Sequence, residues 1–248
     1  RTYLTGGVGT YRDLEDFGDD YELPNLGCWN EICAAVGNVL WNHRLFLLER
    51  EAKYIDMLER ILYNGMLAGV SLGGDEFLYQ VPLKAVAGFA REPWFGPNCC
   101  PPNLARTLAR LGDFVFATGP GGEIYVNLFV GSRARIETER GVVAVALKTE
   151  YPWNGMVRLT VDPEKDGEFP LHVRIPGWAR NEPMPGGLYR PADEPSGPVD
   201  VRINGSPAEF AVESGYAVLS RTWSKGDAVE IELPMPVRRV RADDRVAD

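Results

Sequence analysis

The sequence predicts an α + β protein in which a helical part precedes a part made of strands. Residues 31–50 carry apolar residues on more than one helical face, which is typical of a well-buried helix. From residue 124 onward, apolar residues alternate with other residues, as they do in half-buried strands. The period changes near the glycine-rich stretch 119–122, which divides the 248 residues into a helical region, 1–119, and a strand region, 120–248.

Two further helices are predicted in the helical region. Residues 52–67 repeat apolar side chains at helical spacing, and Gly69 follows them as a stop signal. A third helix begins after the cysteine pair at 99–100. Pro101 and Pro102 suit its first turn, because a missing N–H costs nothing there.

The strand region reads as an antiparallel β-sandwich. Alternating apolar residues mark strands within 124–130, 143–147, 157–161 and 171–175, and further short strands follow residue 199. Residues 181–198 have the composition of a long surface loop. Asn204-Gly205-Ser206 matches a glycosylation sequon, but we interpret Asn204-Gly205 as a hairpin turn.

Charge and hydropathy argue against two classes of partner. The formal net charge of −9 disfavours nucleic acid, because phosphate binding needs a basic face. No stretch approaches the apolar length of a membrane helix, so we expect no membrane partner. The chain starts at Arg1 without an initiator Met or signal peptide, and we expect it to be a piece of a longer protein.

The four cysteines indicate metal or redox chemistry, because they are too few for a disulfide scaffold. Glu31 and Cys33 lie near the start of one predicted helix, and Cys99 and Cys100 directly precede another. Three thiolates and a carboxylate are a reasonable tetrahedral zinc set. No C-x-x-C spacing is present, so ordinary buried cysteines remain an open alternative. We interpret Cys28 as a packing residue.

Two features point toward catalysis without fixing it. A thiolate at a helix N-terminus is favoured by the helix dipole, and a bound cation removes its proton, so such a sulfur is able to act as a nucleophile. The segment "YRDLEDFGDDYELPN" is crowded with acids. No spacing rule selects one of them, and each is compatible with a solvated loop.

Several long segments together resemble glycoside hydrolase family 127, a family that includes β-L-arabinofuranosidases. They are "TYLTGGVG", "LEDFGDDYELPN", "NEICAAVGNVLWNHRLF", "FLYQVPL", "CCPPNLARTLARL" and "LHVRIPGWAR". The resemblance covers nearly the entire chain. It implies part of an (α/α)6-barrel catalytic domain in residues 1–119, followed by an antiparallel β-sandwich domain, itself incomplete, in residues 120–248.

The resemblance also implies the roles of particular residues. It implies a zinc ion, Zn2+, whose ligands are Glu31, Cys33, Cys99 and Cys100. Cys99 is then also the nucleophile, Glu15 is the general acid/base, and Tyr79 in "FLYQVPL" contacts the sugar. The implied reaction is retaining hydrolysis of a β-L-arabinofuranoside, with an arabinose-containing oligosaccharide or glycoconjugate as substrate.

Alternatives stay open beside this expectation. The chain is also compatible with hydrolysis of another furanoside or of a branched acidic sugar from plant cell-wall glycans. A non-catalytic carbohydrate-binding protein with a structural zinc is a third interpretation. A homodimer is compatible with the sequence, and zinc thiolates persist best in a reducing cytoplasm, which is the location we expect.

The chain departs from the family pattern at a few positions. Pro97 stands where many members have a further cysteine, which is not among the four ligands. The family's sugar-site histidines are expected to precede Arg1. His43 is predicted to be a packed or helix-surface residue, and His172 is predicted to point to solvent.

Overall fold

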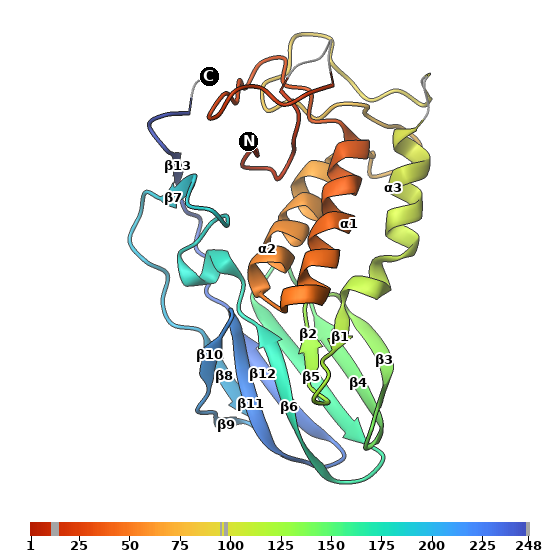
Figure 1. Ribbon diagram of the computed structural model, residues 1–248, viewed down its shortest axis with the longest axis vertical. Helices are drawn as coiled ribbons and strands as arrows, with labels where there is room; N and C mark the ends of the chain where they lie inside the picture. The colour runs from red at the N-terminus through yellow and green to blue at the C-terminus, as the bar shows by residue number, and fades with distance from the viewer. Residues whose placement is uncertain (11–14, 95, 97–98, 247–248) are drawn as a thin grey trace.

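The computed structural model describes residues 1–10, 15–94, 96 and 99–246, and places a helical layer above two β-sheets (Figure 1). The helical layer holds α1 (Ile32–Glu49), α2 (Ala52–Arg60) and α3 (Cys100–Ala109). A π-helical turn, η1 (Ile61–Met66), and a 3₁₀ turn, η2 (Leu67–Gly69), prolong α2, and η3 (Leu111–Phe114) follows α3. The predicted α + β class and the three predicted helices are confirmed.

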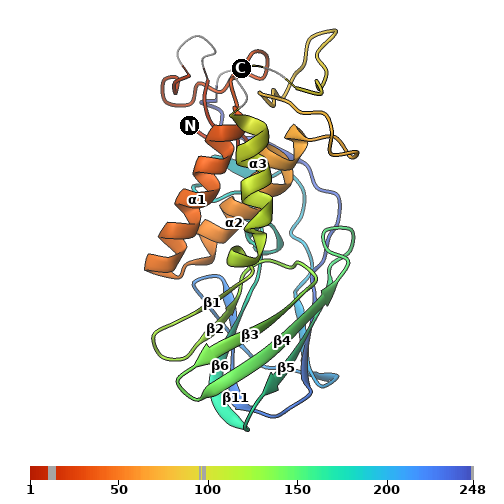
Figure 2. The same cartoon turned by 90° about the vertical axis from the view of Figure 1, so that its right-hand side faces the viewer.

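The helical layer is held together by the buried side of α1. Ile32, Val36 and Phe46 on this side are at most 2% exposed and belong to a cluster that also takes in α2 and α3. α3 packs against α1, as the turned view shows (Figure 2). Gly69 lets η2 approach the start of α1 closely, because a Cβ there would lie 2.4 Å from the Ile32 side chain.

The strands form two large sheets and one short ribbon within the described residues. The five-stranded sheet has the order β1 (Phe116–Thr118), β2 (Ile124–Val126), β6 (Gly167–Arg174), β11 (Tyr216–Trp223), β10 (Ala211–Glu213). The six-stranded sheet has the order β3 (Ser132–Thr138), β4 (Gly141–Thr149), β5 (Met156–Pro163), β12 (Asp227–Glu232), β8 (Asp200–Ile203), β9 (Ser206–Pro207). The ribbon pairs β7 (Tyr189–Pro191), which lies in the predicted loop, with β13 (Val240–Ala242).

One core lies between the two sheets. It combines inward-facing side chains of β2, β6 and β11 with those of β4, β5 and β12. Its members include Val126, Leu171, Leu219, Val145, Leu159 and Ile231, each at most 3% exposed. The period-two alternation seen in the sequence therefore marks the faces that meet in this core.

The pairing of the five-stranded sheet differs from the predicted antiparallel pattern at one place. β2 pairs with β6 in parallel, with Tyr125 opposite His172. The chain leaves the sheet after β2, forms β3, β4 and β5 in the other sheet, and returns as β6. Such a long crossover permits parallel pairing, which a hairpin does not.

The predicted turns are found where the glycines stand. Residues 119–122 connect β1 to β2, so the sheet already begins at Phe116. Asn204 and Gly205 connect β8 to β9 with φ values of 52° and 81°, which is the left-handed conformation that a two-residue hairpin turn needs. The interpretation of Asn204-Gly205 as a hairpin turn is confirmed.

A buried ion-pair network joins the helical layer to the sheets. Arg174 of β6 is fully buried, and its guanidinium binds Asp56 at 2.6 Å and also binds Glu59, both on α2. The same guanidinium donates to the carbonyl of Asn127 at 2.5 Å. The two layers are therefore connected by charge-assisted hydrogen bonds as well as by apolar packing.

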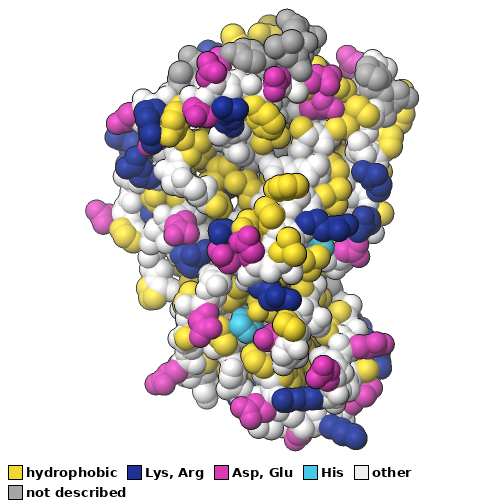
Figure 3. All heavy atoms as spheres, in the orientation of Figure 1, with side chains coloured by type: hydrophobic (Ala, Val, Ile, Leu, Met, Phe, Trp, Pro, Cys, Tyr) yellow, Lys and Arg dark blue, Asp and Glu magenta, His cyan; other side chains and the backbone are white. Residues whose placement is uncertain are grey.

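The surface of the helical layer is partly apolar. Hydrophobic side chains gather over this layer on the face seen in Figure 3. Trp41 and Leu48 on α1 are 66% and 75% exposed. No helix within the described residues has the length and hydropathy that crossing a bilayer demands.

Candidate functional site

The N-terminal ends of α1 and α3 bring four potential metal ligands together. Glu31 directly precedes α1, and Cys33 lies in its first turn. Cys99 directly precedes α3, and Cys100 is its first residue, followed by the two prolines in the first turn. Both helices begin at this point, and the positive ends of their dipoles favour anionic side chains there, although the two prolines leave the first turn of α3 with few N–H groups.

One ligand atom from each of these four residues lies within 4.8 Å of every other. We call the group of Glu31, Cys33, Cys99 and Cys100 the thiol cluster. Cys33 Sγ is 3.4 Å from Cys100 Sγ, and Cys99 Sγ is 3.8 Å from Cys100 Sγ. The Oε1 atom of Glu31 is 3.8 Å from both Cys99 Sγ and Cys100 Sγ.

These distances fit a tetrahedral zinc ion. Zinc–sulfur bonds of about 2.3 Å around a tetrahedral ion put two sulfurs about 3.8 Å apart. Three thiolates and one carboxylate are also a ligand type that zinc accepts. The part of the chain that the structure describes therefore offers a complete set of four ligands, and both its donor chemistry and its spacing suit Zn2+.

Two neighbouring side chains orient the ligands of the thiol cluster. The Trp29 indole Nε1 donates to Oε2 of Glu31 at 2.9 Å, which leaves Oε1 directed at the sulfurs. The Asn103 amide Nδ2, one helical turn after Cys99, donates to Cys33 Sγ at 3.1 Å. Such outer hydrogen bonds fix the orientation of metal ligands.

Burial changes the acidity of two of the thiols. Burial raises the pKa of Cys33 to about 11, and it also raises the pKa of Cys100 well above the usual thiol range. In the metal-free protein these thiols are therefore protonated at neutral pH. A bound cation would reverse this preference, because a coordinating thiol loses its proton.

Backbone pairing places Tyr79 beside the thiol cluster. The carbonyl of Tyr79 accepts from Ile32 N at 3.0 Å, and Val81 N donates to Asn30 O at 3.1 Å. The pKa of the Tyr79 hydroxyl is raised, first by burial and then by the negative charges of Glu31, Cys99 and Glu15. The phenol ring also packs edge-on against Trp29, with ring centroids 5.4 Å apart.

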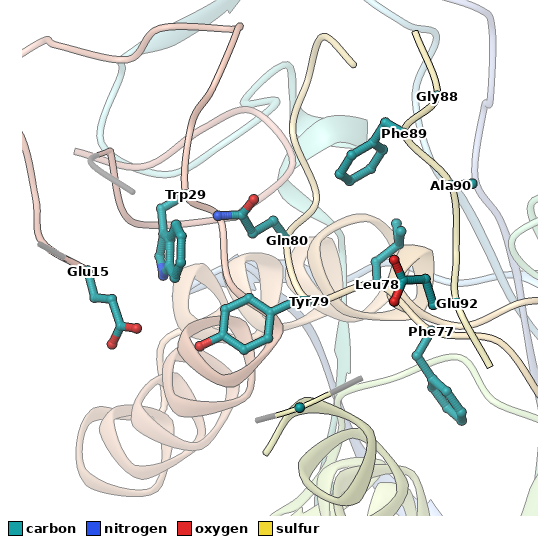
Figure 4. Close-up of a pocket in the computed structure, with 11 residues that line it drawn as sticks. Glu15, Trp29, Phe77, Leu78, Tyr79, Gln80, Gly88, Phe89, Ala90 and Glu92 are labelled. Atoms are coloured by element: carbon teal, nitrogen blue, oxygen red, sulfur yellow. The ribbon is translucent and has the colours of Figure 1, made fainter. Parts of the chain in front are cut away.

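A pocket of about 510 Å³ opens next to this tyrosine. Glu15, Trp29 and Tyr79 line one side of it, and Phe77, Phe89 and Glu92 lie among the residues of the other side (Figure 4). The Glu15 carboxylate and the Tyr79 hydroxyl point toward the same space in this view (Figure 4). Glu15 itself is exposed and has a φ of 48°, a conformation that non-glycine residues adopt rarely.

Sequence reasoning named the four residues that meet in the thiol cluster but missed two of the residues around them. Trp29 and Asn103 belong to no recognisable motif. Once the thiol cluster was known, their positions would have been a signal, because Trp29 lies two residues before Glu31 and Asn103 lies four residues after Cys99. Cys28 lies outside the thiol cluster and packs with Tyr3 and Leu23, as predicted. Pro97, which replaces a family cysteine, lies outside the described residues.

Neither histidine lies at the thiol cluster. His43 packs edge-on against Phe114 with ring centroids 4.8 Å apart, so its prediction as a packed residue is confirmed. His172, predicted to point to solvent, lies on the face away from the core between the sheets, but it stacks on Tyr125 at 4.5 Å and is half-buried there. The outer face of the five-stranded sheet is covered by the helical layer there, since Tyr125 belongs to the core of that layer.

Comparison with known proteins extends over nearly the whole chain. Residues 1–113 match the family model for the GH127 catalytic domain of beta-L-arabinofuranosidase, and residues 123–235 match the GH127 middle domain. A non-reducing end beta-L-arabinofuranosidase of Bifidobacterium longum is 31% identical over 263 residues. The alignment covers 99% of this chain and 37% of that protein.

Solved structures agree with this assignment. A GH127 beta-arabinofuranosidase matches with a TM-score of 0.95 at 42% identity. The GH127 beta-L-arabinofuranosidase from Geobacillus stearothermophilus T6 matches with a TM-score of 0.88 at 37% identity. Each match covers 99% of this chain and 38% of the other, so the chain spans well under half the length of these relatives. With both of its halves matched, the chain belongs to glycoside hydrolase family 127.

Proposed function

We propose that the protein is a retaining glycoside hydrolase that acts on β-L-arabinofuranosides, with Cys99 as nucleophile and Glu15 as general acid/base. The observation that carries the proposal is the thiol cluster, which lies beside a pocket lined by Glu15 and Tyr79. The beta-L-arabinofuranosidase relatives support the substrate class. The substrate would be an arabinose-containing oligosaccharide or glycoconjugate.

The proposal includes a domain organisation. Residues 1–119 would form the C-terminal part of an (α/α)6-barrel catalytic domain, and residues 120–248 a β-sandwich domain. The catalytic and middle-domain family models, which match 1–113 and 123–235, support this division. The exposed apolar side chains Trp41 and Leu48 support further helices packed against α1.

We assign the metal of the thiol cluster as zinc, held by Glu31, Cys33, Cys99 and Cys100. When bound, zinc would keep the sulfurs ionised at neutral pH and hold them in place. The Trp29 indole would keep one carboxylate oxygen turned toward the metal, and the Asn103 amide would keep the Cys33 sulfur in position.

The reaction would proceed in two displacements at the anomeric carbon. In the first, the Cys99 sulfur forms a bond to that carbon, the glycosidic C–O bond breaks, and Glu15 gives its proton to the leaving oxygen. In the second, Glu15 takes a proton from water, the water oxygen bonds to the anomeric carbon, and the C–S bond breaks. Two inversions retain the configuration. The Tyr79 hydroxyl, close to the charges of Glu15 and Cys99, would hydrogen-bond the sugar.

The lining of the pocket favours a neutral sugar over a branched acidic one. Its described titratable lining residues are Glu15, Tyr79 and Glu92, and no described Lys, Arg or His lines it. A sugar carboxylate would meet two carboxylates there without a counter-charge, which is unfavourable. A neutral arabinofuranose would meet hydrogen-bonding groups and aromatic rings there without this repulsion.

Kinetics of the full protein on aryl β-L-arabinofuranosides test the proposal. Cys99→Ser and Glu15→Gln should each lower turnover by about 10²–10⁴-fold. The loss of turnover in Glu15→Gln should be smaller for a substrate with an activated leaving group, because such a group departs without protonation. Cys28→Ala, a cysteine outside the thiol cluster, is the matched control and should keep its turnover.

Two further readouts separate the nucleophile from the metal. Acid-quenched wild-type protein should carry one pentosyl group on the peptide that contains Cys99, and Glu15→Gln should accumulate it. Elemental analysis should find about one zinc per chain in active protein, with activity lost on chelation and regained on zinc addition. Full activity of Cys99→Ser would refute the nucleophile, and active protein without metal would refute the zinc.

A further inference from the structure

A second pocket lies between α2, the turn after β4 and the short helix η4 (Gly177–Arg180). η4 packs beside α2, as its place in Figure 1 shows. The pocket has a volume of about 360 Å³ and shares no lining residue with the pocket at the thiol cluster. Its walls are dominated by four aromatic side chains, Tyr63, Tyr151, Trp153 and Trp178.

The aromatic walls combine three partly buried rings, those of Tyr63, Tyr151 and Trp178, with one exposed ring, that of Trp153. Tyr151 and Trp178 are nearly parallel, with an interplanar angle of 20° and centroids 6.4 Å apart. Tyr63 meets Tyr151 at 63° with centroids 6.2 Å apart. Trp153, on the turn itself, is 90% exposed, which is unusual for the largest apolar side chain. An exposed ring such as that of Trp153 is suited to stack on the C–H face of a sugar, and the partly buried rings beside it give the pocket an apolar wall.

The floor of the pocket is charged but balanced. Asp56 lies between two guanidinium groups, 2.6 Å from Arg174 and 3.1 Å from Arg180. Glu59 binds Arg174, and Glu182 at the rim lies 3.3 Å from Arg180. Two arginines are thus shared among three carboxylates, and Arg60, which also lines the pocket, supplies the third positive charge, so the charges of the floor balance.

Polar groups at the rim suit a ligand with hydroxyls. Asn64 is exposed and lines the pocket, and its Nδ2 donates to the carbonyl of Arg60 at 2.9 Å, which holds the amide in place. The Glu182 carboxylate is 63% exposed and is able to accept from a ligand hydroxyl. An apolar pocket with a few fixed polar groups is the usual form of a small-molecule site.

The backbone is adapted to keep this pocket in place. A Cβ at Gly177 would lie 2.8 Å from the carbonyl of Glu182 and 2.9 Å from Oδ2 of Asp56. Only glycine therefore lets η4 approach α2 this closely, and the approach sets the width of the pocket. The buried network around Arg174 fixes the floor from below.

We propose that this aromatic pocket is a second, non-catalytic binding site for a neutral sugar unit of an arabinose-containing glycan. The choice of sugar rests on the proposed function, whereas the neutral, hydroxyl-rich character of the ligand follows from the pocket itself. Such a site would hold one sugar unit of a long glycan by ring stacking, while a different end of the same glycan reacts at the thiol cluster.

Calorimetric titration of the full protein with an α-linked arabinofuranose trisaccharide tests the site. A β-specific glycosidase does not cleave this probe, so its binding is measured without turnover. Trp153→Ala should weaken binding by about tenfold or more, because it removes one stacking face. Trp153→Phe should restore most of the affinity, and Asn64→Leu should lower it. Bound trisaccharide should also protect Trp153 from hydroxyl-radical oxidation.

Controls separate this site from catalysis and from folding. Val237→Ala, a fully exposed apolar residue away from the pocket, should bind the trisaccharide like the wild type. Hydrolysis of a small aryl β-L-arabinofuranoside and the melting temperature should be unchanged in Trp153→Ala, so a failed hydrolysis assay would count against the proposed function alone. The second site is refuted if the wild type does not bind the trisaccharide or if Trp153→Ala binds it equally well.

Protection of Trp153 from oxidation in the absence of added sugar would also overturn the proposal, because it would identify the pocket as a protein interface.

Discussion

At the scale of single residues, the ligands of the thiol cluster depend on side chains that are not ligands. Trp29 holds Glu31 from one side, and Asn103 holds Cys33 from the other. Both donate N–H groups, so each holds the side chain that it contacts in one orientation. The protein thus builds its site from two helix N-termini and two fixed donors.

Asn103 provides a direct test of this arrangement. Asn103→Leu keeps the volume of the side chain but removes the N–H···S contact to Cys33. We expect the zinc dissociation constant to rise by about 10–100-fold, measured by competition with a chromophoric chelator. Arg106→Ala, an exposed residue of the same helix, is the matched control and should leave the constant unchanged. Equal affinities in Asn103→Leu and the wild type would contradict a positioning role.

The sequence predicted which residues meet in the thiol cluster better than it predicted the residues around them. Cys99 and Cys100 could be singled out because adjacent cysteines before a proline-led helix are unusual. Glu15 and Tyr79 could be named only through resemblance, because acids and tyrosines are common in loops. Tyr79 reaches the thiol cluster through backbone pairing with Ile32, a contact between residues far apart in sequence that local spacing does not reveal.

At the scale of elements, the spacing of apolar residues predicted which segments form strands and which face of each strand is buried. The alternation of apolar residues located β4, β5 and β6, because each buries one face in the common core. The parallel pairing of β2 with β6 was missed, because the sequence shows which face is buried but not which strand lies alongside. The π-helical turn η1 was also missed, since helical spacing does not distinguish it from a continuation of α2.

The turn before β12 is stabilised by a buried carboxylate. Asp227 accepts from Ser224 N at 2.9 Å and from Asn204 Nδ2 at 2.8 Å, and so ties this turn to the β8–β9 hairpin. These hydrogen bonds lower the pKa of Asp227 below the unperturbed value of 3.8, and the bond from Ser224 has the larger effect. Asp227→Asn should lower the free energy of unfolding at pH 7 by about 1–2 kcal/mol in urea denaturation.

The pH dependence of this effect has a definite sign. Because the folded pKa of Asp227 is depressed, its stabilisation is complete above pH 3.8 and is lost as the pH falls through the folded pKa. The difference between wild type and Asp227→Asn should therefore shrink below pH 3.8. Asp200→Asn, in an exposed ion pair with Arg202, should show a much smaller difference. A difference that stays constant with pH would contradict the assignment.

At the scale of the whole molecule, a single arginine connects the layer that carries the thiol cluster to the sheets. Arg174 lies on β6, yet its guanidinium binds Asp56 and Glu59 on α2. Tyr216 of β11 adds a hydrogen bond to Asn127 Oδ1 at 2.7 Å nearby. The same carboxylates form the floor of the aromatic pocket, so this network joins the two layers at that pocket.

Removing Arg174 should cost far more than removing an exposed arginine. Arg174→Met leaves Asp56 and Glu59 buried with less compensation, so we expect a loss of about 3–5 kcal/mol in the free energy of unfolding of the full protein. Arg158→Met, which breaks an exposed ion pair with Glu230, is the control and should cost about 0–1 kcal/mol. Adding Glu59→Gln to Arg174→Met should recover part of the loss, because it removes one uncompensated charge. Equal costs for Arg174→Met and Arg158→Met, measured in urea, would show that apolar packing alone joins the layers.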